Sequence, residues 1–133
     1  MILNISEAAN LAMHALAYLV NHPDFSPVSA GRVARSLGAS EAHMSKVFQR
    51  LAKAGLVKSV RGPKGGFFLT RLAGDITLRD IYEAIDGRLA GQRCLFEHPV
   101  CGRESCVFGD LVATVHAQID RRFSGTTLAD LIE

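Results

Sequence analysis

Residues 28–71 carry the pattern that most constrains how this chain can fold. A helical period of apolar residues runs up to residue 37, breaks at Gly38 and resumes over residues 40–54. Two helices joined by about three residues are typical of a helix-turn-helix unit. In the second helix, the apolar residues at the three-and-four spacing of one buried face are Met44, Val47, Phe48 and Leu51.

A hairpin pattern follows the second helix. Residues 56–60 and 67–70 are short β-prone runs, and the connection over residues 61–66 contains three glycines and Pro63. Glycine permits positive φ and close backbone approach, and proline fixes a turn. The sequence therefore predicts a wing whose tip carries basic residues. The residue order of a phosphate-binding P-loop is absent from this connection.

Positive charge is concentrated in this segment. Residues 28–71 hold nine basic residues and one acidic residue, a net charge of +8, whereas the rest of the chain has six basic and twelve acidic residues, or −6. The whole-chain charge of +2 hides this asymmetry. A basic block on one compact element is the electrostatic footprint of a nucleic-acid-binding protein. Alone, the hairpin would be interpreted as an ordinary surface turn; beside a basic helix it is interpreted as a DNA-binding wing.

The remaining elements are predicted to be helical. Asn4 or Ser6 can cap a first helix, and Thr77 opens a capping box for a helix that ends at Gly87. From Cys106 onward an apolar stripe continues for too long to belong to a surface helix that has nothing to pack against. We therefore expect this helix to pack against the same helix of a second chain. A final short helix is expected over residues 127–132. The stripe consists of Phe108, Leu111, Val112, Val115, Ile119 and Phe123.

These patterns predict a mainly α fold with a small β-hairpin wing, in which a winged helix-turn-helix domain is joined to a long C-terminal dimerisation helix. We expect the winged helix-turn-helix DNA-binding domain over residues 1–87, a cysteine-containing loop over 88–106, and the dimerisation helix and C-terminal short helix over 107–133. A content of 48% hydrophobic and 21% charged residues excludes a disordered chain. Neither a membrane span nor a secretory signal is recognisable, so a cytoplasmic protein is expected.

Three cysteines lie in the loop, which has neither helical nor strand periodicity. Cys94, Cys101 and Cys106 are an odd number of thiols, unlike a secreted disulfide framework, and in a reducing compartment such a cluster is more often metal-binding or redox-active. Three thiolates suit iron–sulfur or zinc ligation. Spacing leaves a cluster, zinc, a thiol–disulfide switch and metal-free thiols all open.

Several runs together resemble the Rrf-two (Rrf2) family of bacterial winged helix-turn-helix regulators, which includes the iron–sulfur cluster regulator and the nitrite-sensitive repressor. The resemblance covers nearly the whole chain, and the wing followed by Ile-Thr-Leu-Arg-Asp-Ile is specific in combination. It implies a homodimer that binds a partly palindromic DNA operator near promoters, and we expect a repressor. The runs are residues 5–7 with 14–19, residues 51–57, residues 61–67 and residues 76–81.

The resemblance also implies that the three cysteines hold an iron–sulfur cluster, 2Fe-2S or 4Fe-4S, that senses redox, iron or nitric oxide state. A histidine that follows the last cysteine in one branch of the family is Gly109 here, so the fourth ligand is open. Glu7 and His14 from the partner's first helix are the first candidates, with His98 and Asp110 as alternatives. Equally, His14 fits a hydrogen-bonded core histidine and Glu7 a first-turn residue that the helix dipole favours.

In the DNA-binding interpretation, the second helix enters the major groove and the wing contacts the backbone or the minor groove. Two other classes compete with it: a winged-helix protein-interaction module, and an enzyme, which the lack of a nucleophile–base pair disfavours. The residues predicted to contact DNA are Arg32, Ser40, Glu41, His43, Lys46, Gln49, Arg50, Lys53, Lys58, Arg61 and Lys64.

Overall fold

Side-chain caps fix where the first four α-helices begin in the computed structural model, which describes residues 4–89, 91, 93–96, 98–102 and 104–133. Ser6, Ser29 and Ser40 each accept a hydrogen bond from a backbone N–H three residues onward, and Thr77 forms the predicted capping box with Asp80. The helices so capped are α1 (Glu7–Asn21), α2 (Ala30–Leu37), α3 (Glu41–Lys53) and α4 (Leu78–Asp86).

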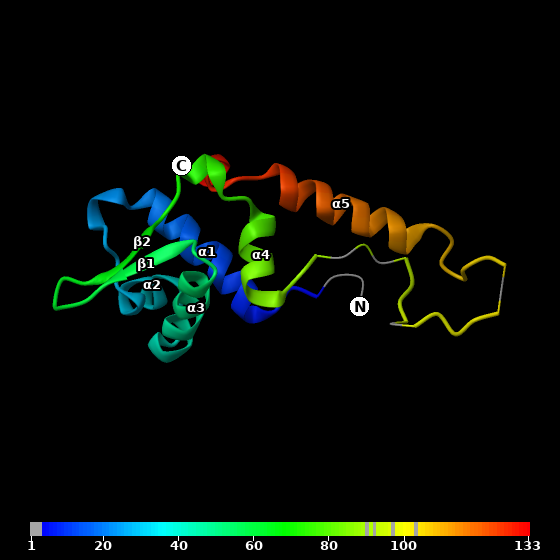
Figure 1. The fold of residues 1–133 in the computed structure, drawn as a ribbon, viewed down its shortest axis with the longest axis horizontal. Coiled ribbons are helices and arrows are strands. Elements are labelled where there is room, and N and C mark those ends of the chain that lie inside the picture. The colour runs from blue at the N-terminus through cyan, green and yellow to red at the C-terminus, as the bar shows by residue number, and fades with distance from the viewer. Residues whose placement is uncertain (1–3, 90, 92, 97, 103) are drawn as a thin grey trace.

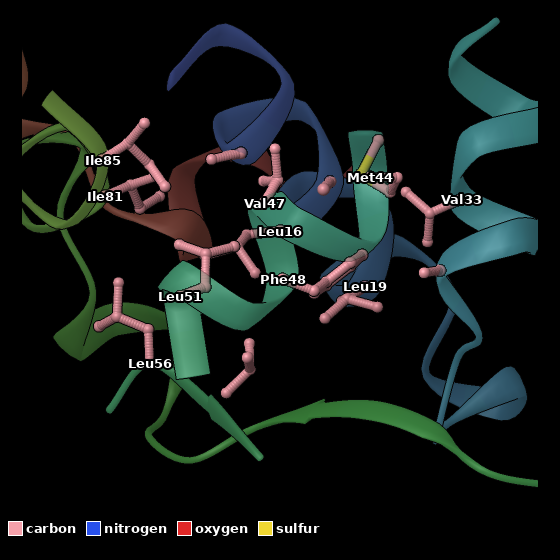
Figure 2. Packing of buried hydrophobic residues seen from close by; sticks show 14 of the residues in the cluster. Leu16, Leu19, Val33, Met44, Val47, Phe48, Leu51, Leu56, Ile81 and Ile85 are labelled. Atoms are coloured by element: carbon pink, nitrogen blue, oxygen red, sulfur yellow. The ribbon is translucent and has the colours of Figure 1, made fainter. Parts of the chain in front are cut away.

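Helix α3 lies at the centre of the hydrophobic core. Its four predicted inward residues are fully buried, and they face leucines of α1 and Val33 of α2 (Figure 2). Ile81 and Ile85 of α4 close the core on another side. Because α3 buries one full face, its opposite face is held rigidly toward solvent. The α1 residues labelled in this core are Leu16 and Leu19.

The wing is an antiparallel hairpin of β1 (Val57–Val60) and β2 (Gly66–Leu69), within one residue of the predicted strands. It is fastened to the segment before α2, because Val28 and Phe67 exchange two backbone hydrogen bonds of 3.0 and 2.8 Å. Phe67 also stacks on Phe48 of α3, with ring centroids 4.5 Å apart. The mainly helical fold with a hairpin wing, as the sequence predicted, is therefore observed.

The C-terminal half extends away from the winged-helix unit. Helix α5 (Leu111–Gly125) and the loop before it reach outward in Figure 1, and α5 packs on α4. The helix begins at Leu111, four residues after the start of the predicted segment 107–133, and Gly109 adopts a left-handed conformation (φ 61°) just before it. The short 3-10 helices are η1 (Pro23–Phe25), η2 (Ala73–Asp75) and η3 (Leu128–Leu131).

The chain end returns to the winged-helix core. Leu128 of η3 is fully buried in the same cluster as the residues of α1 and α3, and a β-bridge joins Thr127 to Thr77 at the start of α4. Helix α5 is thus anchored to the core at its C-terminal end, while its N-terminal end carries the cysteine loop. In the described part of the chain, no helix has the length and apolar character needed to cross a membrane.

Candidate nucleic-acid interface and cysteine cleft

The outer face of α3 presents a polar and basic row. Lys46, Gln49 and Lys53 are exposed and recur at helical spacing on the side opposite the core residues. The core holds this row on a rigid element, so its side chains start from fixed backbone positions. A helix of this kind can enter the major groove and contact base edges and phosphates.

The first turn of α3 is fixed by its cap and by its neighbour α2. Ser40 accepts the N–H of His43 at 3.1 Å, and His43 is half-buried. The exposed Glu41 lies over Gly31 of α2, where a Cβ atom would sit 3.0 Å from the Glu41 Cδ. Gly31 therefore leaves the space that the Glu41 carboxylate occupies, and the sequence alone did not reveal this contact.

Arg50 is exposed on α3 and reaches the neighbouring helix α4. Its Nη2 donates to the carbonyl of Ile85, at the C-terminal end of α4. Its guanidinium thereby joins the C-terminal end of α3 to α4. This contact satisfies one of the last carbonyls of α4, which no intrahelical N–H can reach. The contact with DNA that the sequence predicted for Arg50 stays a prediction.

The wing carries three exposed basic residues, Lys58, Arg61 and Lys64. Its backbone geometry depends on glycine: Gly62 has a φ of 112°, and a Cβ atom at Gly65 would lie 2.1 Å from the carbonyl oxygen of Val60. The bonded Val28–Phe67 pair then holds the wing next to α2. The basic side chains at the wing tip are therefore carried by a hairpin that backbone hydrogen bonds fix to the rest of the domain.

Arg32 of α2 is held in place by a column of aromatic rings that sequence reasoning missed. Its guanidinium carbon lies 3.7 Å from the ring centroid of Phe25, a cation–π contact. Phe25 stacks on His22 with centroids 5.7 Å apart, and His22 stacks on Tyr18 at 4.0 Å. A pocket of about 410 Å³ between Arg32 and Lys64 connects this column with the wing tip.

The three cysteines lie before α5, and none is in a disulfide. Cys94 is half-buried, whereas Cys101 and Cys106 are exposed. Among the described residues, no group of three or more His, Cys, Asp or Glu side chains is close enough to hold a metal ion. The structure thus keeps the predicted sulfur donors in one loop without gathering them around a centre.

Among the described residues, the other predicted ligands do not join the cysteines in a group of three or more possible metal ligands. Glu7 and His14 are exposed on α1, and the Nδ1–H of His14 donates to the Asn10 carbonyl of its own helix at 2.8 Å. The loop candidates His98 and Asp110 are exposed as well. His14 is therefore hydrogen-bonded but is not a core residue.

Cys94 lines a cleft of about 730 Å³ between the cysteine loop and α5. His116 of α5 lines the same cleft, although it is only 9% exposed, and sequence reasoning missed it because it falls within an apolar stripe. Arg79 of α4 forms ion pairs of 3.0 Å with Glu83 and with Asp120 of α5 at the edge of this cleft. Hydrogen bonding to Glu83 raises the pKa of the Arg79 guanidinium above the ordinary value for arginine.

A helix-turn-helix with a basic outer helix and a braced basic wing defines a winged-helix DNA-binding protein. The chain belongs to the Rrf2 family: the profile of that family, described as "Iron-dependent Transcriptional regulator", matches residues 5–133. It is accordingly a transcriptional regulator of the Rrf2 type and not an enzyme.

Similar proteins include two regulators with different names. The chain is 31% identical to the HTH-type transcriptional regulator IscR of Serratia proteamaculans, over 98% of this chain and 79% of that protein. The structure of T. potens IscR matches with a TM-score of 0.73 and 29% identity, over 97% of this chain and 85% of the other. The structure of CymR, the global cysteine regulator of B. subtilis, matches with a TM-score of 0.79 and 27% identity, over 97% of this chain and 95% of the CymR chain.

Proposed function

We propose that this regulator acts as a homodimeric repressor that binds a partly palindromic DNA operator through α3 and the wing. One observation carries the proposal: two basic elements lie side by side, and each is fixed to the core. Helix α3 is fixed by its buried face, and the wing is fixed by the hydrogen bonds between Val28 and Phe67. In this proposal, the first turn of α3 reads base edges, Arg61 enters the minor groove and Lys64 contacts phosphate. Arg32, Lys53 and Lys58 add positioning contacts.

The outward side of α5 supports the homodimer. On α5, Leu111 is 49% exposed and Val115 and Ile119 are half-buried, and Phe108, three residues before the helix, is 51% exposed. Apolar side chains along one exposed helical side fit a second copy of the same helix. A dimer then presents two α3 helices to half-sites about 34 Å apart, or a multiple of one DNA turn.

The cysteine loop supports a sensing role for the same protein. Cys94, Cys101 and Cys106 provide three soft donors on a loop without regular structure, which suits an iron–sulfur cluster chemically. When bound, such a cluster supplies redox and nitric oxide chemistry. Glu7 and His14 of a partner subunit remain candidates for a fourth position.

A thiol switch is the second candidate for the sensor. Cys101 and Cys106 are exposed thiols, and exposure makes a thiol accessible to oxidants. Reversible oxidation of these two side chains would also change the loop before α5. Iron and sulfide analysis of anaerobically purified protein separates the two sensors.

Selection from a random-sequence duplex library tests the DNA-binding proposal. The expected result is enrichment of two inverted half-sites, with Lys46→Ala and Gln49→Ala lowering the affinity for the selected duplex. Arg121→Ala, which removes an exposed basic residue from α5, is the matched control and is expected to bind normally. Absence of any sequence enrichment would identify a protein-interaction module instead, and enrichment of single half-sites would contradict the dimer.

A further inference from the structure

The cleft between the cysteine loop and α5 carries an excess of positive charge. Three arginines and one acidic residue belong to its described lining, and they are Arg79, Arg88, Arg93 and Asp120. With a neutral His116, three positive charges and one negative charge give these lining residues a net charge of +2. A concave surface with an excess of one sign of charge focuses its field and attracts ions of the opposite sign. The cleft therefore attracts small anions.

This positive charge is separate from the proposed DNA interface. Figure 1 shows the tip of the wing at one end of the molecule and the loop before α5 at the other. In the proposed complex the duplex contacts α3 and the wing, so the arginines of the cleft remain available for a different anion.

Arg79 fixes the wall of the cleft, and its donors are already used. Its guanidinium pairs with Glu83 and with Asp120 of α5, each at 3.0 Å, and donates to the Leu89 carbonyl at 3.5 Å. The Leu89 N–H in turn donates to Glu83 at 3.1 Å, and Leu89 is only 9% exposed. The chain therefore leaves α4 along a fixed path, and Arg88 directly precedes the anchored Leu89.

Arg88 and Arg93 keep their donors available for a ligand. Both are exposed and line the cleft, and neither takes part in an ion pair within the described part of the chain. A guanidinium presents its N–H donors as a planar fork that binds a carboxylate or a phosphate through two parallel hydrogen bonds. Two such groups on one cleft suit a molecule that carries two anionic groups.

His116 adds a third donor from the α5 side of the cleft. It is only 9% exposed, and none of the described residues hydrogen-bonds or ion-pairs with its ring. Among described residues that are not exposed, every side-chain nitrogen and oxygen either reaches solvent or has a hydrogen-bond partner, so the ring nitrogens of His116 reach solvent. Since a largely buried polar group without a partner is unfavourable, a ligand in the cleft would supply the missing acceptor.

The rest of the wall favours an organic anion. The apolar residues of the described lining are Leu89, Phe96, Pro99, Ala113 and Ala117. The cleft volume of about 730 Å³ lies within the range of sites for small molecules, which combine apolar walls with a few placed polar groups. Apolar walls also exclude water, and this strengthens charge-assisted hydrogen bonds. A short hydrocarbon chain between two anionic groups fits such a lining better than a bare inorganic ion.

We propose that the cleft is a binding site for a small organic dicarboxylate. Arg88 and Arg93 bind its two carboxylates, and the imidazole of His116 donates a further hydrogen bond from α5. The bound molecule thereby joins the loop after α4 to α5. This site goes beyond the proposed function, because it depends neither on DNA nor on a metal held by the cysteines.

Isothermal titration calorimetry on the whole chain, without metal and in reducing buffer, tests the proposal. The probes are malonate, succinate, glutarate and adipate, which differ in the separation of their carboxylates. At least one is expected to bind once per chain, and the monocarboxylate of the same length about tenfold more weakly or less. Arg88→Ala and Arg93→Ala are each expected to weaken binding by about 10- to 100-fold, and His116→Phe by about two- to tenfold. Arg121→Ala, an exposed arginine of α5 outside the described lining, is the matched control and is expected to bind normally.

Several results would overturn the site: no binding of any dicarboxylate, equal binding of the monocarboxylate, inorganic phosphate binding more tightly than every dicarboxylate, or unchanged affinity in both arginine variants. Sedimentation equilibrium is run on the same variants. If Arg88→Ala disrupts a dimer while dicarboxylate affinity is unchanged, the arginines belong to a subunit contact and the site is refuted. Affinity for the selected duplex is measured separately, so absent DNA binding with intact dicarboxylate binding refutes only the proposed function.

Discussion

Replacement of Phe25 by alanine tests whether the aromatic column prepares Arg32 for DNA. Phe25 is 43% exposed and outside the buried cluster, so its loss leaves the core intact. The substitution removes the ring that lies 3.7 Å from the Arg32 guanidinium carbon, but it leaves the positive charge itself in place. Any effect on DNA affinity then comes from orientation and not from charge number.

The size of the effect follows from the contact. A cation–π pair at an exposed site contributes about 0.5–1 kcal/mol. Immobilising a released arginine on DNA costs a similar amount, about 0.5–1.5 kcal/mol. Because 1.4 kcal/mol corresponds to a tenfold change, Phe25→Ala is expected to raise Kd by about two- to fivefold for each Arg32 engaged.

Salt dependence separates this effect from the loss of a phosphate contact. Fluorescence anisotropy with the selected duplex is measured over a series of salt concentrations. Arg32→Ala is expected to reduce the slope of log K against log salt by about 0.9 per subunit, whereas Phe25→Ala lowers the affinity at an unchanged slope. Leu72→Ala, which removes another exposed apolar side chain, is the control.

The double variant gives the decisive comparison. If Phe25 acts only through Arg32, the pair Phe25→Ala and Arg32→Ala together binds no more weakly than Arg32→Ala alone. A further loss in the double variant would show that Phe25 acts elsewhere. Unchanged binding of Phe25→Ala at every salt concentration would refute the role of the ring column.

Further expectations concern the wing, the chain end and a titrating tyrosine. Lys64→Ala is expected to weaken binding to all duplex sequences and to reduce the salt slope by about one unit per subunit; an unchanged slope would remove the wing from the interface. Leu128→Ala should lower the free energy of unfolding by about 2–5 kcal/mol in urea titrations, whereas the exposed Ile132→Ala should have little effect. Burial, and then the nearby Asp86, raise the pKa of Tyr82 above 10.0, so the stability it contributes is complete below about pH 10 and is lost as pH rises through the native pKa. Tyr82→Phe is expected to abolish this alkaline dependence, and a phenolate absorbance titration of Tyr82 at its ordinary pKa would contradict it.

The parts of the fold that the sequence predicted well are those that depend on residues close together in the chain. The core face of α3 follows from apolar spacing alone, and Ser29, Ser40 and Thr77 cap the helices as expected because capping requires only neighbouring backbone groups. The wing was recognisable because its glycines and Pro63 constrain the backbone directly. The start of α5 was not recognisable, since the apolar stripe already begins at Phe108, before the left-handed Gly109.

The features that escaped prediction depend on contacts between distant residues. Arg50 is exposed, as its spacing predicted, but its hydrogen bond to a carbonyl thirty-five positions away in α4 has no signal in the sequence. Phe25 and Arg32 meet across an irregular segment that has no period. His116 resembles a gap in an apolar stripe until the cleft that it shares with Cys94 is known. Tertiary packing decides each of these positions.

Helix α4 connects the cysteine cleft with α3. At one side, Arg79 pairs with Asp120 of α5 and its guanidinium reaches the Leu89 carbonyl, and all three residues line the cleft. At the C-terminal end of α4, the Ile85 carbonyl accepts from Arg50 of α3. A rigid helix transmits a small rotation along its length, and in the proposed homodimer two half-sites on DNA would accept only one spacing of the α3 helices. A change in the cleft that turns α4 would therefore alter DNA affinity through the position of α3.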